Sequence, residues 1–185
     1  MLLMLVKIVF VLIHVAIAIY DFSFYRIPNV LLGGLLVLYA LYAPIYLGSE
    51  KILSALIVFA IVLVISFGLF AIKYIGGGDA KYISVASLWA GGAGVVKFIF
   101  LVALIGGVLG LAYLLLRDHL ARLSDKVWVQ IQKGETRYPF LQYLWIGSGI
   151  GAEEGKREAI SSRMLPYGVA IATGAIIMMM FNLAL

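Results

Sequence analysis

Long apolar runs alternate with short polar stretches along this chain. Most of them reach the ~20 residues that an α-helix needs to cross a hydrocarbon core of ~30 Å. The pattern therefore predicts an all-α polytopic membrane protein, a six-transmembrane-helix bundle that forms a single domain over residues 1–185. The six expected spans are Leu2–Tyr20, Val30–Leu47, Ile52–Ile72, Ala80–Ala93, Val95–Leu116 and Met164–Leu185.

The fourth expected span is short. Its 14 residues, Ala80–Ala93, rise only ~21 Å at ~1.5 Å per residue. We therefore expect this helix to start or end inside protein or in thinned bilayer. Directly after it, Gly91-Gly92-Ala93-Gly94 is a glycine cluster of the kind that interrupts helices. The cluster predicts that spans four and five form a hairpin rather than one overlong helix.

The polar segment between spans five and six, about 117–163, is the largest in the chain. Apolar residues recur in its first part at intervals of three or four, which predicts that span five continues as an amphipathic helix to about Lys133, ended by Gly134. The residues with this spacing are Leu116, Leu120, Leu123, Val127 and Ile131. Pro139–Ile146 is too short to span the bilayer and is rich in aromatic residues, so we expect an interfacial segment.

Composition narrows the class of protein further. The chain is 64% hydrophobic and 12% charged, with a mean hydropathy of +1.11, so the bilayer must be its solvent. The absence of cysteine excludes a disulfide framework, a thiol nucleophile and a cysteine-based zinc site. Two histidines are too few for a typical catalytic zinc site. We expect no metal and no cofactor.

The basic residues indicate how the bundle is oriented. Net charge is +5, but Lys and Arg are spread through loops and form no stripe with aromatic residues, which argues against nucleic-acid binding. Eleven of the 14 lie at the first, third and fifth loops; only Lys7, Lys51 and Lys97 lie on the opposite side. The positive-inside rule then places the odd loops in the cytoplasm and both termini outside.

Two aspartates stand where apolar runs meet polar residues. Asp21 and Asp79 are separated by two expected spans, so both emerge at the same membrane face, and Glu50 is the only other carboxylate outside the fifth loop. Carboxylates at membrane depth are functional candidates, because burying them is costly. Two carboxyls that share one proton can activate a water and protonate a leaving nitrogen. The pair therefore favours the chemistry of an aspartic protease.

The residues around each aspartate suit this role. Gly76, Gly77 and Gly78 lack side chains directly before Asp79, which would let a substrate backbone or an opposing helix approach closely. After Asp21, Ile27-Pro28-Asn29 predicts a fixed linker, because Pro28 restricts Ile27 to extended backbone and suits the first turn of the next helix.

Structural explanations of the same residues stay open. Asp79 would also serve as the N-cap of a helix that begins at Ala80. Gly76–Gly78 would also suit an ordinary turn, and Asp21 an ordinary span end. His14 lies seven residues before Asp21 on the same helix face. It either tunes or hydrates that site or makes an interhelical hydrogen bond, which we prefer.

At this point the motifs resemble a known family. Asp21 followed by Ile27-Pro28-Asn29, and then Gly76-Gly77-Gly78-Asp79-Ala80-Lys81, resembles the type IV prepilin peptidases and archaeal preflagellin peptidases, membrane aspartic proteases of the Gly-x-Gly-Asp class. Pro166-Tyr167-Gly168-Val169-Ala170-Ile171-Ala172 resembles the short, Tad-pilus branch. The resemblance implies that Asp21 and Asp79 are catalytic. It also implies a substrate-side or active-site loop role for Gly76–Gly78, Lys81, Ile27, Pro28 and Asn29, with Pro166, Tyr167 and Gly168 as supporting residues.

The resemblance also implies a substrate and a location. Family members cut the leader from pilin-like precursors at the cytoplasmic face of the inner membrane, so the expected partners are a membrane-helix precursor and the lipid bilayer, and a homo-oligomer stays open. The chain starts in its first span and has no cysteine, so the methyltransferase activity of the longer bacterial enzymes is not implied. A coupled transporter would carry its aspartates near midmembrane and in repeated halves. A non-enzymatic assembly subunit would tolerate Asp79→Asn.

Overall fold

The computed structural model describes residues 1–137 and 165–181. Every regular element in these two ranges is a helix, and the first three agree with the expected spans to within four residues at each end. The helices are α1 (Leu2–Phe24), α2 (Asn29–Tyr46), α3 (Ser49–Ala71), α4 (Gly77–Arg137) and α7 (Tyr167–Met180).

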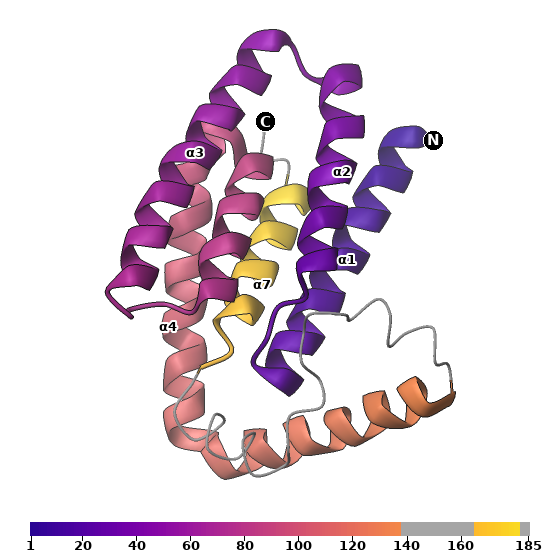
Figure 1. Ribbon diagram of the computed structural model, residues 1–185, viewed down its shortest axis with the longest axis vertical. Coiled ribbons are helices and arrows are strands. Elements are labelled where there is room, and N and C mark those ends of the chain that lie inside the picture. Colours follow the sequence, from indigo (N-terminus) through magenta and orange to yellow (C-terminus); the bar gives the residue numbers. More distant parts are fainter. Residues whose placement is uncertain (138–164, 182–185) are drawn as a thin grey trace.

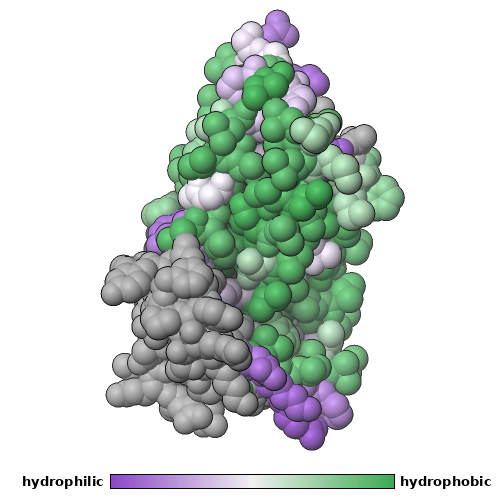
Figure 2. All heavy atoms as spheres, turned by 90° about the vertical axis from the view of Figure 1, so that its right-hand side faces the viewer, coloured by the Kyte–Doolittle hydropathy of each residue, from purple (hydrophilic) through white to green (hydrophobic). Residues whose placement is uncertain are grey.

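The surface of the bundle is that of a membrane protein. Four helices are long and apolar enough to cross a bilayer: α1, α2, α3 and the part of α4 that ends at Leu116; α7 is a shorter apolar helix. Figure 2 shows a face whose middle is mainly hydrophobic, with hydrophilic residues concentrated toward its top and bottom. An apolar middle with polar ends is the arrangement expected of a bundle that spans a bilayer with water on both sides.

Helix α4 reverses direction at the predicted glycine break. Gly91 has φ 62° and ψ −178°, a backbone conformation that is essentially restricted to glycine. Before the break, Ala80 accepts a hydrogen bond from Ser66 near the end of α3, whereas Gly92 lies against Ser54 near its start. Residues 77–90 therefore run antiparallel to α3 (Figure 1), and the predicted hairpin is confirmed.

The limb after the break returns to the starting end of the bundle. The hydroxyl of Tyr113 lies 3.0 Å from that of Tyr25, just beyond α1. Leu116 then has non-helical backbone (φ −121°, ψ 22°), and residues 117–137 run across the end of the bundle (Figure 1). Our expectation that Gly134 ends this helix is wrong, because α4 is helical to Arg137. A single exposed glycine costs a helix only about 1 kcal/mol. The expected Pro139–Ile146 segment lies outside the described residues.

Helix α7 forms the centre of the bundle. Half of its 14 residues are buried, and most of these are glycine or alanine, which lets neighbouring backbones approach closely in a membrane. A Cβ at Gly106 would lie 2.7 Å from the ring of Tyr167, and one at Gly174 would lie 2.9 Å from Val102. These two glycines serve helix packing. The limb around Val102 and Gly106 thus packs along α7.

Three serines join α3 to the first limb of α4. The hydroxyl of Ser66 lies 3.0 Å from that of Ser84, and both donate to the carbonyl of Ala80, at 3.1 and 2.7 Å. Ser87 donates to the carbonyl of Ser84 at 2.7 Å. All three side chains are buried. Hydrogen bonds between helices in an apolar environment fix their relative position, so α3 holds the start of α4, where Asp79 lies.

Candidate active site

Asp21 lies in the last turn of α1 and is almost fully buried, with 4% of its surface exposed. The backbone N–H groups of Gly168 and Val169, at the start of α7, point at its carboxyl group as hydrogen-bond donors. A Cβ at Gly168 would lie 2.8 Å from Oδ2 and 2.9 Å from Cγ of Asp21. Only glycine allows α7 to come this close. Gly168 therefore borders a carboxyl group and does more than pack helices.

The chain leaves α1 through a tight turn. Tyr25 has left-handed backbone (φ 52°, ψ 36°), and its N–H donates to the carbonyl of Asp21 at 2.9 Å. A non-glycine residue rarely adopts this conformation. The hydroxyl of Tyr25 pairs with that of Tyr113 at 3.0 Å. This contact ties the turn to the second limb of α4.

Asp79 lies in the first turn of α4. The helix begins at Gly77 and the N–H of Ala80 donates to the carbonyl of Gly76, so Asp79 is the third helical residue. The alternative that it is the N-cap of a helix beginning at Ala80 is therefore wrong. Its carboxylate instead accepts a hydrogen bond from the backbone N–H of Gly76. This is the returning half of a capping box, so Asp79 also stabilises the start of its own helix.

Ile27 brings the two aspartates' surroundings together. Its Cβ would lie 3.5 Å from a Cβ at Gly78, and its Cδ1 would lie 3.0 Å from one at Gly168. The carboxyl groups of Asp21 and Asp79 are close enough to interact electrostatically. The two aspartates thus lie at one end of the bundle, as their spacing predicted, and share one site.

The other predicted site residues lie around this pair in different ways. Lys81 donates to the side-chain oxygen of Asn29 at 3.4 Å, which connects the first turns of α4 and α2. Pro28 precedes α2 as its N-cap with extended backbone (ψ 126°). Gly77 faces the ring of Phe70, which a Cβ would approach to 3.1 Å. The described side chains contain no group of three or more His, Asp or Glu residues that could hold a metal ion.

The supporting residues at the start of α7 have different surroundings. Pro166 is buried and caps the helix, and its carbonyl accepts from the N–H of Val169 at 3.2 Å. Tyr167 points at Gly106. Only Gly168 of the three reaches Asp21 itself.

Sequence reasoning missed two tyrosines near Asp21. Tyr82 and Tyr113 are both within electrostatic reach of its carboxyl group. The preferred interpretation of His14 is also wrong, because its Nδ1 bonds the carbonyl of Phe10 in the same helix at 2.9 Å. A signal for Tyr82 existed, since it follows Asp79 by three residues and so lies on the same side of α4.

The family comparison agrees with this geometry. Residues 8–111, more than half of the chain, match the type IV leader peptidase family. The match contains both aspartates and most of the residues that surround them. No curated protein and no solved structure matches the chain significantly.

Proposed function

We propose, because the chain belongs to the type IV leader peptidase family, that Asp21 and Asp79 are the catalytic pair of this aspartic-type peptidase. The family acts on prepilins and removes their leader peptides. The observation that carries the assignment is the shared site: a buried carboxyl group, Asp21, and a half-buried one, Asp79, from opposite ends of two helices, interact at one end of a membrane bundle.

The pair supplies both functions that amide hydrolysis needs. Like charges this close disfavour double ionisation, so the pair retains one proton and contains a base and an acid together. The ionised carboxylate takes a proton from a water, whose oxygen attacks the scissile carbonyl carbon. The protonated carboxyl donates its proton to the leaving nitrogen as the C–N bond breaks, giving a carboxylate and an amine. The two ionisations belong to the pair and not to either residue.

We infer six spans within one peptidase domain: α1, α2, α3, the two limbs of α4 and α7. The limbs of α4 are antiparallel, which supports counting them separately. The basic residues at the Asp21 end support an orientation with this end in the cytoplasm and the N-terminus outside. Prepilin leaders would then be cut at the cytoplasmic face of the inner membrane.

The substrate is itself a membrane helix, which supports lateral docking through the bilayer next to the aspartates. Basic residues near a prepilin leader would meet the acidic pair. The stretch Pro166–Ala172 supports a substrate from Tad-type pili, since it resembles that branch.

Co-expression with a candidate prepilin tests the peptidase assignment. We expect a shortened precursor by intact mass with the wild-type chain and none with Asp21→Asn or Asp79→Asn at equal membrane levels. Glu50→Gln is the matched control, because this substitution also removes one carboxylate. Glu50 lies in the first turn of α3, at the opposite end of the bundle. Cleavage by either Asn variant would contradict the catalytic pair, whereas no cleavage by the wild-type chain would favour a transporter or an assembly subunit.

Accessibility of single cysteines tests the orientation. The native chain has no cysteine, so Tyr74→Cys and Ser49→Cys each give one thiol, at opposite ends of α3. Both native side chains are exposed, Tyr74 by 80%. An impermeant thiol reagent on intact cells should label the cysteine at 49 and not the one at 74. The reverse pattern would invert the orientation.

A further inference from the structure

Three buried polar atoms follow the interface between α1 and the first limb of α4. They are Nε2 of His14, the hydroxyl oxygen of Tyr82 and Oδ2 of Asp21, and none has a hydrogen-bond partner among the described residues. His14 and Tyr82 are 0% exposed and Asp21 is 4% exposed. Buried polar groups normally find a partner, a protein group or an ordered water, so this group of atoms requires an explanation.

Tyr82 lies between the other two. Its ring centroid is 5.7 Å from that of His14, and it is within electrostatic reach of Asp21. His14 and Asp21 occupy the same face of α1, two helical turns apart. Nδ1 of His14 faces the carbonyl of Phe10, which only accepts, so Nδ1 carries the proton and Nε2 is left as an acceptor.

We propose that Tyr82 is a positioning residue for Asp21: its hydroxyl is joined to Oδ2 through one internal water that also reaches Nε2 of His14. An internal water needs two to four polar partners, and this site offers three. Such a water can accept from the Tyr82 hydroxyl while it donates to Oδ2 of Asp21 and to Nε2 of His14. The proposal rests on the proposed function, because it assigns Tyr82 a part in the same reaction.

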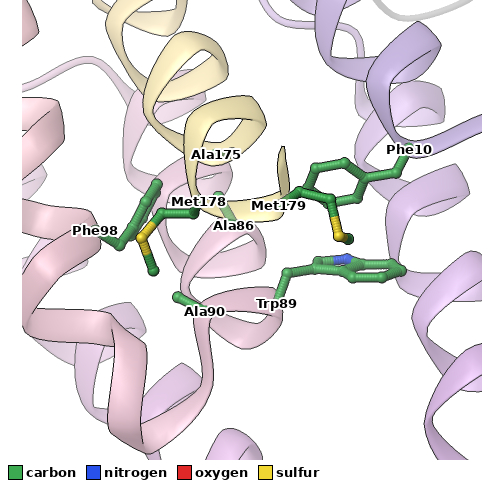
Figure 3. A pocket seen from close by; sticks show the side chains of 8 residues that line it. All are labelled: Phe10, Ala86, Trp89, Ala90, Phe98, Ala175, Met178 and Met179. Atoms are coloured by element: carbon green, nitrogen blue, oxygen red, sulfur yellow. The ribbon is translucent and has the colours of Figure 1, made fainter. Parts of the chain in front are cut away.

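The row of three buried polar atoms ends at His14. A cavity of about 10 Å³ lies there, lined by Phe10, Ala86, Trp89, Ala90, Phe98, Ala175, Met178 and Met179. Figure 3 shows aromatic, thioether and methyl groups around it. Among the lining side chains only Trp89 carries a nitrogen or oxygen atom, which is fewer than the two to four polar partners that an internal water needs. The proposed water is thus confined to the Asp21 side of the interface.

The expected effect is on the chemical step. Holding Oδ2 toward Tyr82 fixes the rotation of the Asp21 carboxyl group and leaves its other oxygen in a defined direction for the reacting water. Misplacement of a catalytic group by about 1 Å costs on the order of a hundredfold. Substrate docking involves surfaces that Tyr82 does not reach, because it is fully buried.

The kinetic test compares two variants that each remove one buried hydroxyl. Tyr82→Phe keeps the ring against His14, and Tyr39→Phe removes the unpartnered hydroxyl of a tyrosine that packs on Trp89. We expect Tyr82→Phe to lower kcat for prepilin cleavage by about tenfold to a hundredfold with KM within about twofold. Tyr39→Phe should keep both constants within about twofold. Equal kcat in the two variants would overturn the proposal.

Infrared spectroscopy of the same proteins tests the hydrogen bond without any turnover. The carboxyl stretching band of Asp21 is assigned by its loss in Asp21→Asn. This band should shift in Tyr82→Phe and stay in place in Tyr39→Phe. An unmoved band in Tyr82→Phe would overturn the proposal even if kcat falls, since the fall would then reflect packing. If the band shifts in Tyr82→Phe but the wild-type protein cleaves no prepilin, the proposed function is refuted and the hydrogen bond is still supported.

Discussion

Asp21 and Asp79 share a site but are held in opposite ways. Asp79 lies at the N-terminal end of its helix, where the helix dipole favours negative charge, whereas Asp21 lies at a C-terminal end, where the dipole opposes it. Asp79 accepts its hydrogen bond from the N–H of Gly76, three residues earlier in the sequence. Asp21 depends on N–H groups from α7, far away in the sequence.

This difference divides the site into a local half, Asp79 with the N–H of Gly76, and a tertiary half, Asp21 with the N–H groups of α7. The hydrogen bond of the local half can form with the first turn of α4, because Gly76 and Asp79 both lie within four consecutive residues. The tertiary half requires α1 and α7 to meet within hydrogen-bond distance. A disturbance in helix packing should therefore affect Asp21 first.

The largest expected effect is the same for both aspartates. Asp21→Asn and Asp79→Asn should each lower prepilin cleavage by about a thousandfold or more, because neither variant retains both a base and an acid. The double variant should be no worse than either single one, since the two act as a unit. Cleavage rates measured at equal membrane levels check this. Additive losses would mean that the two aspartates work separately.

Added methyl groups should separate the two halves. A Cβ at Gly168 meets Oδ2, Cγ and Ile27 within 3.0 Å, whereas one at Gly76 meets only Oδ2 of Asp79 that closely, at 2.9 Å. The side chain of Asp79 can rotate away from the added methyl group, whereas the more closely surrounded side chain of Asp21 cannot. We expect Gly168→Ala to lower kcat about a hundredfold and Gly76→Ala about tenfold.

Gly107→Ala is the control for these two variants, because a Cβ there meets nothing within 4 Å. Its cleavage rate should stay within about twofold of wild type. Equal losses in Gly168→Ala and Gly76→Ala would mean that the two carboxyl groups do not differ in their ability to move away from an added methyl group.

Stability should reveal the capping role that only Asp79 has. Asp79→Ala removes the acceptor for the Gly76 N–H, and the loss should lower the free energy of unfolding by about 1 kcal/mol relative to Asp79→Asn, which keeps an acceptor oxygen. Both variants are inactive, so thermal denaturation in detergent compares them without interference from activity. Equal stabilities would mean that the cap contributes nothing.

The smallest effect concerns the turn that leads to Asp79. Lys73 has left-handed backbone (φ 63°) after α3, where the N–H of Tyr74 donates to the carbonyl of Leu69 in a Schellman motif. Lys73→Gly should raise the free energy of unfolding by about 0.5–1 kcal/mol, with cleavage unchanged. Tyr25→Gly makes the matching change near Asp21. It should gain nothing, because it loses the contact with Tyr113. A gain in both variants would show that this contact is dispensable.

The elements of the fold were predictable from the sequence because their causes are local. Apolar runs of spanning length predicted α1, α2 and α3, and the Gly91 cluster predicted the reversal in α4. The shared membrane face of the two aspartates followed from counting spans. Gly134 was misjudged, since one glycine is a weak helix breaker when the helix continues on both sides.

The tertiary half of the site was less predictable. Nothing in Pro166-Tyr167-Gly168 says that its backbone meets Asp21, because that depends on where α7 enters the bundle. His14 was expected to bond a neighbouring helix, but its Nδ1 bonds the carbonyl of Phe10 in its own helix. Tyr82 went unnoticed because an aromatic residue in an apolar span is usually packing.

The start of α7 also has a consequence for biosynthesis. All the other described helices precede α7 in the chain and are therefore translated before it. Asp79 and its cap can form on the nascent protein, but Asp21 meets its N–H donors only after α7 has inserted into the bilayer. With Asp21 in the proposed catalytic pair, the peptidase would thus stay inert beside its own membrane substrates until α7 has inserted.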